Sequence, residues 1–405
     1  MPRPPVPPAR TALAALAALA AACAAAPAPA TAPRQPPPTL RVALFNVQHL
    51  SAAKAEAVDA DGRGSDPQLV AAAAVVARLR PDVLVLQEVD VPPDEPGRVA
   101  RAFADRYLAP AGVDYPSVFA APSNTGRLSG FDLNDDGHTA TPADLGTRAY
   151  GDDSFGYGEY PGHYGMAVLS RLPLLAEEAR TFRDFRWRDL PGHHLPEGFY
   201  SPAEAAAMPL SSKSHWDLPV EVDGRRLHLL VSHPTPPAFD GEEDRNGRRN
   251  FDEIAFWVRY LDGAPTLADD RGGAGGLPAG APFVVAGDLN ADPLRPASTY
   301  DGTSAIALLL AHPRVADPAA TLTSEGGRRH GRGGAAHPEQ VTAEFLGGMR
   351  VDYLLPAAGI EVIDGGVFWP AAEDDPEGHR LATTASDHRL LWLDLRLPAA
   401  AAAAR

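Results

Sequence analysis

The chain of 405 residues contains a single cysteine, Cys23, so no disulfide can form within it and its stability must come from packing. Beyond the first 38 residues, the sequence has no apolar run long enough to cross a membrane as a helix. Basic residues are outnumbered, with 36 Lys and Arg against 52 Asp and Glu, and the net charge is −16. A tight nonspecific nucleic-acid binder normally carries a basic stripe, so this composition argues against one.

The first 38 residues have the layout of a secretory signal peptide followed by a linker rich in Pro and Ala. Arg3 and Arg10 precede an alanine-leucine run, which is too short to be a membrane span. We therefore expect a secreted or periplasmic protein. The alternative is lipoprotein anchoring through Cys23, although the leucine usually found three positions upstream is displaced to Leu19.

One segment near the C-terminus combines a short apolar run with polar residues at its end. Phe283–Ala286 reads as a buried strand, and Gly287-Asp288-Leu289-Asn290 follows it. In extended chain Asp288 and Asn290 point the same way, so they can enter one pocket. The alternative is an ordinary turn, because Gly, Asp and Asn favour turns for conformational reasons alone.

Further apolar segments also end on, or carry, polar residues, which favours a shared site over an isolated turn. The polar residues of these segments are Asn46, Glu88, His233, Asp352 and the pair Asp387-His388. Open α/β sheets bind their ligands at the carboxyl ends of strands, so we expect these side chains to converge. A carboxylate beside a carboxamide suits an oxygen-rich substrate near a hard metal ion.

These segments, in this order, resemble the endonuclease/exonuclease/phosphatase superfamily. The matching motifs are Phe45-Asn46-Val47, Leu86-Gln87-Glu88, Gly165–Arg171, the His233 segment, Gly287–Asn290, Val351-Asp352-Tyr353 and Ser386-Asp387-His388. The resemblance implies an α/β fold, a four-layer α/β sandwich of two packed, mainly antiparallel sheets flanked by helices. It also implies a divalent-metal phosphoesterase. Because both halves of the motif set are needed for one site, we expect one domain over residues 39–397, followed by an Ala-rich tail over 398–405.

The resemblance assigns metal binding to one part of the set. Glu88 is expected to be the main carboxylate ligand of the metal, with Asn46 nearby to orient it or to bind phosphate. Asp387 is expected to be a weak metal ligand or to support the other ligands from outside the metal's coordination sphere. The expected ion is Mg²⁺ or Mn²⁺. Gln48 stands where some nucleases have a second acid, which argues against a two-metal site.

The remaining motif residues are expected to carry the chemistry. The resemblance gives His388, held by Asp352, the task of activating water or stabilising the phosphate. Asp288 and Asn290 would position the nucleophile and the phosphoryl oxygens. His233 would protonate the leaving group or stabilise the charge of the transition state.

Two other stretches are candidate ligand sites. Arg245 and Arg248 open a segment with helical apolar spacing, where basic side chains beside a helix N-terminus could bind a substrate phosphate. Asp132, Asn134 and Asp136 alternate before a glycine like the opening of an EF-hand calcium loop, so Ca²⁺ is a second candidate ion. The alternatives are a solvated charged patch and a plain surface turn.

We therefore expect a monomeric hydrolase that acts on a phosphate-ester substrate such as nucleic acid, a nucleotide or a small phosphoester, without stable membrane insertion. One alternative is a lipid phosphodiesterase of the sphingomyelinase or phospholipase C type, which needs exposed apolar side chains that no sequence run clearly supplies. The other is a binding module without activity, which the complete motif set disfavours.

Overall fold

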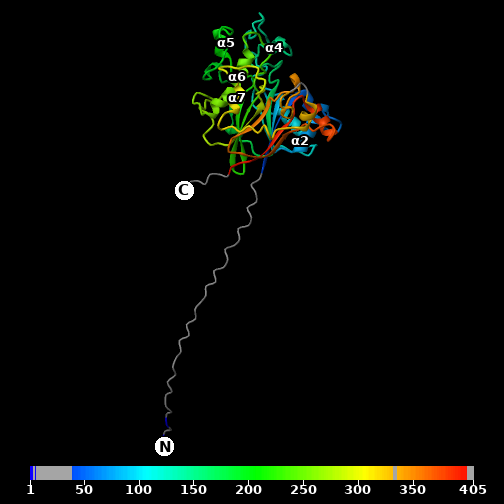
Figure 1. The fold of residues 1–405 in the computed structure, drawn as a ribbon, viewed down its shortest axis with the longest axis vertical. Helices are drawn as coiled ribbons and strands as arrows, with labels where there is room; N and C mark the ends of the chain where they lie inside the picture. Colours follow the sequence, from blue (N-terminus) through cyan, green and yellow to red (C-terminus); the bar gives the residue numbers. More distant parts are fainter. Residues whose placement is uncertain (3–4, 6–38, 332–334, 399–405) are drawn as a thin grey trace. The chain divides into compact units, whose positions relative to one another are not determined.

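The computed structural model describes residues 1–2, 5, 39–331 and 335–398. Almost all of the expected signal peptide and tail therefore lies outside the described residues, and the domain boundaries stay predictions. From residue 39 onward, two β-sheets flanked by helices form the described chain (Figure 1). Within the described ranges, we find no helix with both the length and the apolar character needed to cross a membrane.

The first sheet has six strands in the order β10-β11-β1-β2-β4-β3. Their bounds are β1 Leu40–Leu50, β2 Val83–Val89, β3 Ser117–Phe119, β4 Gly165–Ser170, β10 Glu361–Val367 and β11 Leu391–Arg396. The second sheet has five strands in the order β5-β6-β7-β8-β9. Their bounds are β5 Arg180–Thr181, β6 His215–Val222, β7 Arg225–Ser232, β8 Phe283–Asp288 and β9 Asp352–Pro356. Only the pairs β1/β2 and β7/β8 are parallel, so both sheets are mainly antiparallel, as the sequence predicts.

Helices cover the outer faces of the sheets. The α-helices are α1 Ala52–Glu56, α2 Pro67–Leu79, α3 Arg98–Phe103, α4 Arg148–Asp152, α5 Pro202–Ala207, α6 Arg245–Leu261, α7 Ala305–Leu310, α8 Glu325–His330 and α9 Pro376–Ala385. A π-helical turn, η1 Ala104–Leu108, follows α3, and short 3₁₀ turns are η2 Pro142–Asp144, η3 Ala176–Glu178, η4 Trp187–Asp189, η5 Pro338–Gln340 and η6 Phe345–Gly347. Figure 1 shows α2 on one side of the strands and α6 and α7 on the other.

The buried side chains form layers between these elements. On β1, Val42 and Leu44 lie in the apolar layer between the two sheets, whereas Ala43 and Phe45 pack toward α2 and α9. Apolar side chains of α6 and α7 cover the outer face of the second sheet. Central strands are therefore buried on both faces, which explains their nearly continuous apolar sequence. The predicted four-layer sandwich is confirmed.

The topology brings the polar strand ends to one edge. Parallel β1 and β2 carry their carboxyl ends to the same edge, and so do β7 and β8. Strand β9 runs antiparallel to β8 with Asp352 opposite Asp288, so the start of β9 lies at that edge too. Strand β11 is antiparallel to β1, which places the residues just before it beside the end of β1. Two sheets thus contribute to one site.

Gly287 is the position where β7 and β8 approach too closely for any side chain. A Cβ atom at Gly287 would lie 2.0 Å from the Ser232 carbonyl oxygen. Because both groups belong to backbone, Gly287→Ala should lower the free energy of unfolding in urea by about 3 kcal/mol or more. The matched control is Gly359→Ala, since a Cβ there meets no atom within 4 Å. A loss at Gly287 no larger than the control's would contradict the strand spacing described here.

Candidate active site

The side-chain amide of Asn46 lies at the centre of the strand-end cluster. Its Nδ2 donates to Glu88 Oε1 at 3.1 Å and to Asp288 Oδ2 at 3.0 Å, and lies 3.5 Å from His388 Nε2. Its Oδ1 accepts a hydrogen bond from the Gln48 backbone N–H at 3.0 Å, which fixes the orientation of the Asn46 side chain. Asn46 is fully buried and joins residues from both sheets.

His388 is held on its other side by Asp352. The distance from His388 Nδ1 to Asp352 Oδ2 is 2.9 Å, and both side chains are buried. The Ser386 hydroxyl donates to the Asn46 carbonyl oxygen at 2.7 Å and accepts from the His388 amide at 3.0 Å. The segment Ser386–His388, which leads into β11, is therefore hydrogen-bonded to the end of β1.

Asp288 lies between two imidazoles. Its Oδ2 is 3.6 Å from His233 Nε2 and 3.7 Å from His388 Nε2. Its Oδ1 accepts a hydrogen bond from the Asn290 backbone N–H at 2.9 Å. Asn290 in turn donates its Nδ2 to the Pro234 carbonyl oxygen at 3.1 Å. The structure thus brings together the five residues to which the sequence assigns the chemistry.

Burial and neighbouring charges shift the pKa values of these groups in different directions. Burial alone would lower the pKa of His388, but the carboxylates of Asp352 and Asp288 outweigh it and raise the pKa to about 10. Burial raises the pKa of Asp288 to about 7, and the Asp352 carboxylate adds to this effect. Burial lowers the pKa of His233 well below its usual value, and Lys213 and His388 lower it further. At neutral pH, His388 is therefore an imidazolium and His233 a neutral ring.

Several residues at this edge have left-handed backbone, which non-glycine residues rarely adopt. The φ angles are 45° at Gln48, 65° at His49, 61° at Glu88 and 51° at Asn290. Such strain persists only where surrounding structure enforces it, and it concentrates at functional sites. The concentration of these strained residues at the ends of β1, β2 and β8 is independent support for a functional site there.

Lys213 is a further member of the site that sequence reasoning missed. The side chain is only 6% exposed, and the charges of Glu253, Glu88 and Asp288 act on it. Burial lowers the pKa of its ammonium group, and the negative charges of these carboxylates partly offset that shift. No ion pair within 4 Å joins Lys213 to a carboxylate in the described parts of the chain. A buried cation held near carboxylates without direct pairing suits an anionic ligand.

Helix α6 contributes supporting residues that sequence reasoning also missed. Asn250 donates to the carbonyl oxygens of Thr235 and Leu289, at 2.8 and 2.9 Å. The buried Glu253 carboxylate accepts from the Ser212 amide and hydroxyl and from the Thr235 amide. These bonds fix the segments that carry Lys213 and His233. Because the polar positions of α6 fit an ordinary amphipathic pattern, only the folded chain reveals their partners.

Arg245 and Arg248 begin α6, as the sequence predicts, but their guanidinium groups contact other residues. Arg245 pairs with Glu243, and Arg248 donates to the Glu243 carbonyl oxygen at 3.0 Å and lies 5.2 Å from the Tyr300 ring centroid. The phosphate-binding role proposed for them from the sequence stays a prediction.

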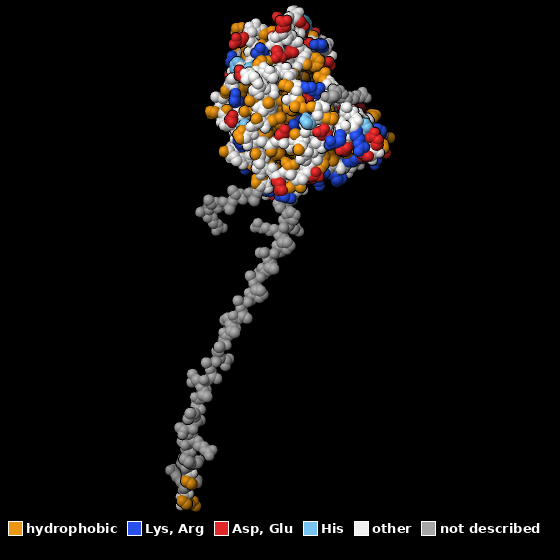
Figure 2. All heavy atoms as spheres, viewed as in Figure 1, with side chains coloured by type: hydrophobic (Ala, Val, Ile, Leu, Met, Phe, Trp, Pro, Cys, Tyr) orange, Lys and Arg blue, Asp and Glu red, His pale blue; other side chains and the backbone are white. Residues whose placement is uncertain are grey.

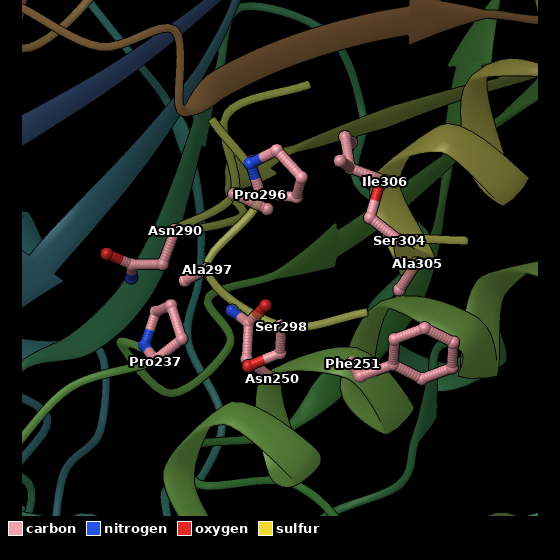
Figure 3. A pocket seen from close by; sticks show the side chains of 11 residues that line it. Pro237, Asn250, Phe251, Asn290, Pro296, Ala297, Ser298, Ser304, Ala305 and Ile306 are labelled. Atoms are coloured by element: carbon pink, nitrogen blue, oxygen red, sulfur yellow. The ribbon is translucent and has the colours of Figure 1, made fainter. Parts of the chain in front are cut away.

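Two of the predicted residues lie at the margins of the cluster: Asp387, and Asn290, whose backbone amide reaches Asp288 while its side chain contacts the Pro234 carbonyl oxygen. The Asp387 amide donates to Gln48 Oε1 at 3.2 Å, so Gln48 fastens the β11 approach instead of supplying a second acid. Asn290 lines a small cavity of about 10 Å³, together with Pro237, Asn250 and Phe251 (Figure 3). Asn290 is the one catalytic candidate that lines this cavity, so the cavity lies beside the cluster and not within it.

The donor set fits a hard divalent cation at Glu88. The carboxylates of Glu88 and Asp288 converge on one amide, and among the described residues neither forms an ion pair with Lys or Arg. Such an excess of carboxylate oxygen suits Mg²⁺. Asn46 presents nitrogen to these carboxylates, so it fits as the group that orients Glu88. Ligand atoms of Asp288, Asp352 and His388 also lie within 4.8 Å of one another, but the 2.9 Å contact between His388 Nδ1 and Asp352 Oδ2 already engages two of these groups.

The acidic loop predicted to bind Ca²⁺ is closed by its own hydrogen bonds. Asp132 accepts from the amides of Asp136 and Gly137, and Asp136 accepts from the His138 amide and from Asn134 Nδ2. These bonds agree with a turn, while the buried Asn134 Oδ1 has no hydrogen-bond partner among the residues that the structure describes. Calcium binding stays a prediction: it requires that millimolar Ca²⁺ raise the melting temperature and that Asp136→Ala abolish the rise.

Comparison with known proteins gives the same family as the sequence motifs. The model of the Endonuclease/Exonuclease/phosphatase family matches residues 43–388, so the chain belongs to this family. Its members are hydrolases that act on phosphoester bonds. A comparison with curated proteins finds no match.

Solved structures with similar folds include the following three. An endonuclease/exonuclease/phosphatase from Beutenbergia cavernae is 21% identical, with a TM-score of 0.50 over 91% of this chain and 74% of that chain. The human Nocturnin catalytic domain with bound sulfate is 15% identical, with a TM-score of 0.46 over 89% and 96%. Sphingomyelinase C from Streptomyces griseocarneus is 16% identical, with a TM-score of 0.44 over 88% and 99%. The first of these supports the shared fold.

Proposed function

We propose that the protein is a metal-dependent phosphoesterase that hydrolyses phosphomonoesters or phosphodiesters in a secreted or periplasmic setting. The observation that carries this proposal is the buried Asn46 amide, which lies against Glu88 of β2, Asp288 of β8 and His388 just before β11. An isolated turn or a simple binding surface would not need carboxylates buried against one another and two imidazoles.

Asp288 is the best candidate for the general base. Its pKa of about 7 lets the carboxylate accept a proton from an attacking water at neutral pH. The water oxygen bonds to phosphorus, one of its protons passes to Asp288, and the ester bond breaks; the departing alkoxide takes up a proton from solvent water. The Asn46 and Asn290 contacts hold this carboxylate in one orientation.

Three nitrogen groups stabilise the phosphoryl oxygens. The His388 imidazolium and the Lys213 ammonium supply positive charge, and neutral His233 supplies one N–H. The lowered pKa of His233 favours this role over protonation of the leaving group. His233 Nδ1 is buried and has no hydrogen-bond partner among the described residues.

Mg²⁺ or Mn²⁺, bound through Glu88 with Asp288 and Asp387 nearby, would supply Lewis-acid polarisation of the phosphoryl group. Asn46 keeps Glu88 in place for that purpose through its 3.1 Å hydrogen bond.

A lipid phosphodiester is the second candidate substrate, because the structure exposes apolar side chains near the site. Leu346 is 79% exposed, and its neighbour Phe345 lies 5.4 Å from the His388 ring centroid. Phe239, on the loop after His233, is 81% exposed. No continuous apolar run marks these residues in the sequence, because they are single positions on separate loops. Figure 2 shows acidic and basic side chains interspersed on one face, without a continuous basic surface there.

Removal of the metal tests the proposed function. Exhaustive treatment with EDTA should abolish hydrolysis of bis-nitrophenyl phosphate, DNA or sphingomyelin vesicles, whichever the enzyme accepts, and Mg²⁺ or Mn²⁺ should restore it. Glu88→Gln should raise the Mg²⁺ concentration needed for half-maximal rate by about 10-fold to 100-fold, by analogy with losses of metal-site groups. Full activity without metal would refute the mechanism.

A second prediction concerns His388 and Asp352, which should act as one unit because a single 2.9 Å contact orients the imidazole. Asp352→Asn and His388→Ala should each lower kcat by about 10³-fold or more, and the double variant should be scarcely worse than the poorer single variant. Single-turnover rates at saturating substrate give the comparison. Multiplicative losses in the double variant would show that the two residues act independently.

A further inference from the structure

A second group of potential ligands lies next to Glu88 and takes no part in the proposed chemistry. It contains His49 at the end of β1, Asp90 just after β2 and His163 just before β4. One ligand atom from each residue can be chosen so that all lie within 4.8 Å of one another. Because β1, β2 and β4 are neighbours in the first sheet, this convergence is built into the strand order.

His163 has an unsatisfied nitrogen inside this group. The residue is 3% exposed, and its Nε2 has no hydrogen-bond partner among the described residues. The ring is clamped between Tyr160 and Tyr164, with centroid distances of 4.2 and 3.6 Å. Burial lowers the pKa of His163 to about 4, so the ring is neutral at pH 7, the form that can ligate a metal. A buried polar atom without a partner calls for an explanation, and a ligand is one.

His49 and Asp90 complete the group from the other side. His49 Nε2 lies 3.4 Å from Asp90 Oδ1, and the Tyr160 hydroxyl lies 2.9 Å from the same nitrogen. Tyr160 donates to the Asp90 carboxylate at 3.0 Å, and the second Asp90 oxygen accepts from the Ala52 amide at 2.9 Å. His49 is held here in left-handed backbone, with φ of 65°. Such strain at a non-glycine residue is typical of functional positions.

We propose that His49, Asp90 and His163 form a transition-metal site, with Zn²⁺ as the best-fitting ion and the Tyr160 hydroxyl or a water as a fourth ligand. Two imidazoles and one carboxylate are ligands typical of zinc, whereas Mg²⁺ prefers oxygen ligands alone. The site is separate from the oxygen-rich centre at Glu88, so the two centres should select different ions.

Several hydrogen bonds must be given up for this site to form, because the Tyr160 hydroxyl already contacts His49 Nε2 and Asp90 Oδ1. The Glu159 amide donates to His163 Nδ1 at 3.2 Å, so without metal Nε2 carries the ring proton. Coordination through Nε2 requires the ring proton to move to Nδ1. The Glu159 backbone amide must then shift away from Nδ1, because two N–H groups would otherwise face each other. The net loss of a few hydrogen bonds is small beside the binding free energy of a protein zinc site.

The proposed ion would stabilise the wall of the active site beside Glu88. Tyr164 stacks on His163, and the Glu88 charge acts on the Tyr164 hydroxyl. A metal at His163 would fix the Tyr160–Tyr164 segment against the ends of β1 and β2. Its role is therefore to position this wall, and it takes no part in bond cleavage.

Cobalt binding tests the proposal directly. Metal-free protein in excess Mg²⁺ should bind one equivalent of Co²⁺ with a visible absorption band of nitrogen-ligated cobalt, and Zn²⁺ should displace it. His163→Gln and His49→Gln should each weaken Co²⁺ binding by at least about 100-fold, as expected for the loss of a metal ligand. His49 is partly exposed, so its variant keeps the test valid if His163→Gln does not fold.

Two controls separate this site from other histidines. His193→Gln, at an exposed position, should leave the Co²⁺ affinity unchanged. Asp288→Asn should keep the absorption band, because it alters only the catalytic cluster. No stoichiometric Co²⁺ binding by the unmutated protein, or unchanged affinity in both ligand variants, would overturn the proposal. The absorption readout does not depend on hydrolysis, so failure of the proposed function would leave it interpretable.

Discussion

The hydrogen bonds of one buried amide, Asn46 Nδ2, are the constraint on which the site depends. This nitrogen contacts Glu88 from the first sheet and Asp288 from the second, and it lies beside His388. Bringing the buried Asp288 carboxylate and the partly buried Glu88 carboxylate together is unfavourable unless donors and positive charge compensate them. Asn46 supplies the donor, and the His388 imidazolium supplies the charge.

The two-sheet architecture meets this requirement with few elements. Each sheet contributes one parallel strand pair, and the carboxyl ends of both pairs lie at the same edge. The apolar layer between the sheets, with Val42 and Leu44 on one side and Val284 and Ala286 on the other, fixes their relative position. A site divided between two sheets therefore needs no flexible loop to bring its charged residues together.

The sequence revealed those parts of the site that follow a repeated local pattern. Asp288, His233 and His388 flank short apolar strands, so strand periodicity and family motifs located them. Lys213 lies between a short helix and β6 in a Ser-rich segment without periodicity, and only tertiary contacts identify it. Likewise, His49 and His163 are joined by strand order across a long stretch of sequence. The arginines at the start of α6 were placed on the right element, but their guanidinium contacts depend on Glu243 and Tyr300, which local pattern does not specify.

The charge state of His388 is the most direct test of this account, and ¹⁵N NMR of the histidine rings measures it. Because Asp352 and Asp288 outweigh burial and raise the pKa of His388 to about 10, both ring nitrogens should be protonated at pH 8 in metal-free protein. In Asp352→Asn the same ring should lose its proton at a lower pH. A neutral His388 ring at pH 8 in the unmutated protein, with a titration midpoint near that of an ordinary histidine, would contradict the charge-compensated cluster around Asn46.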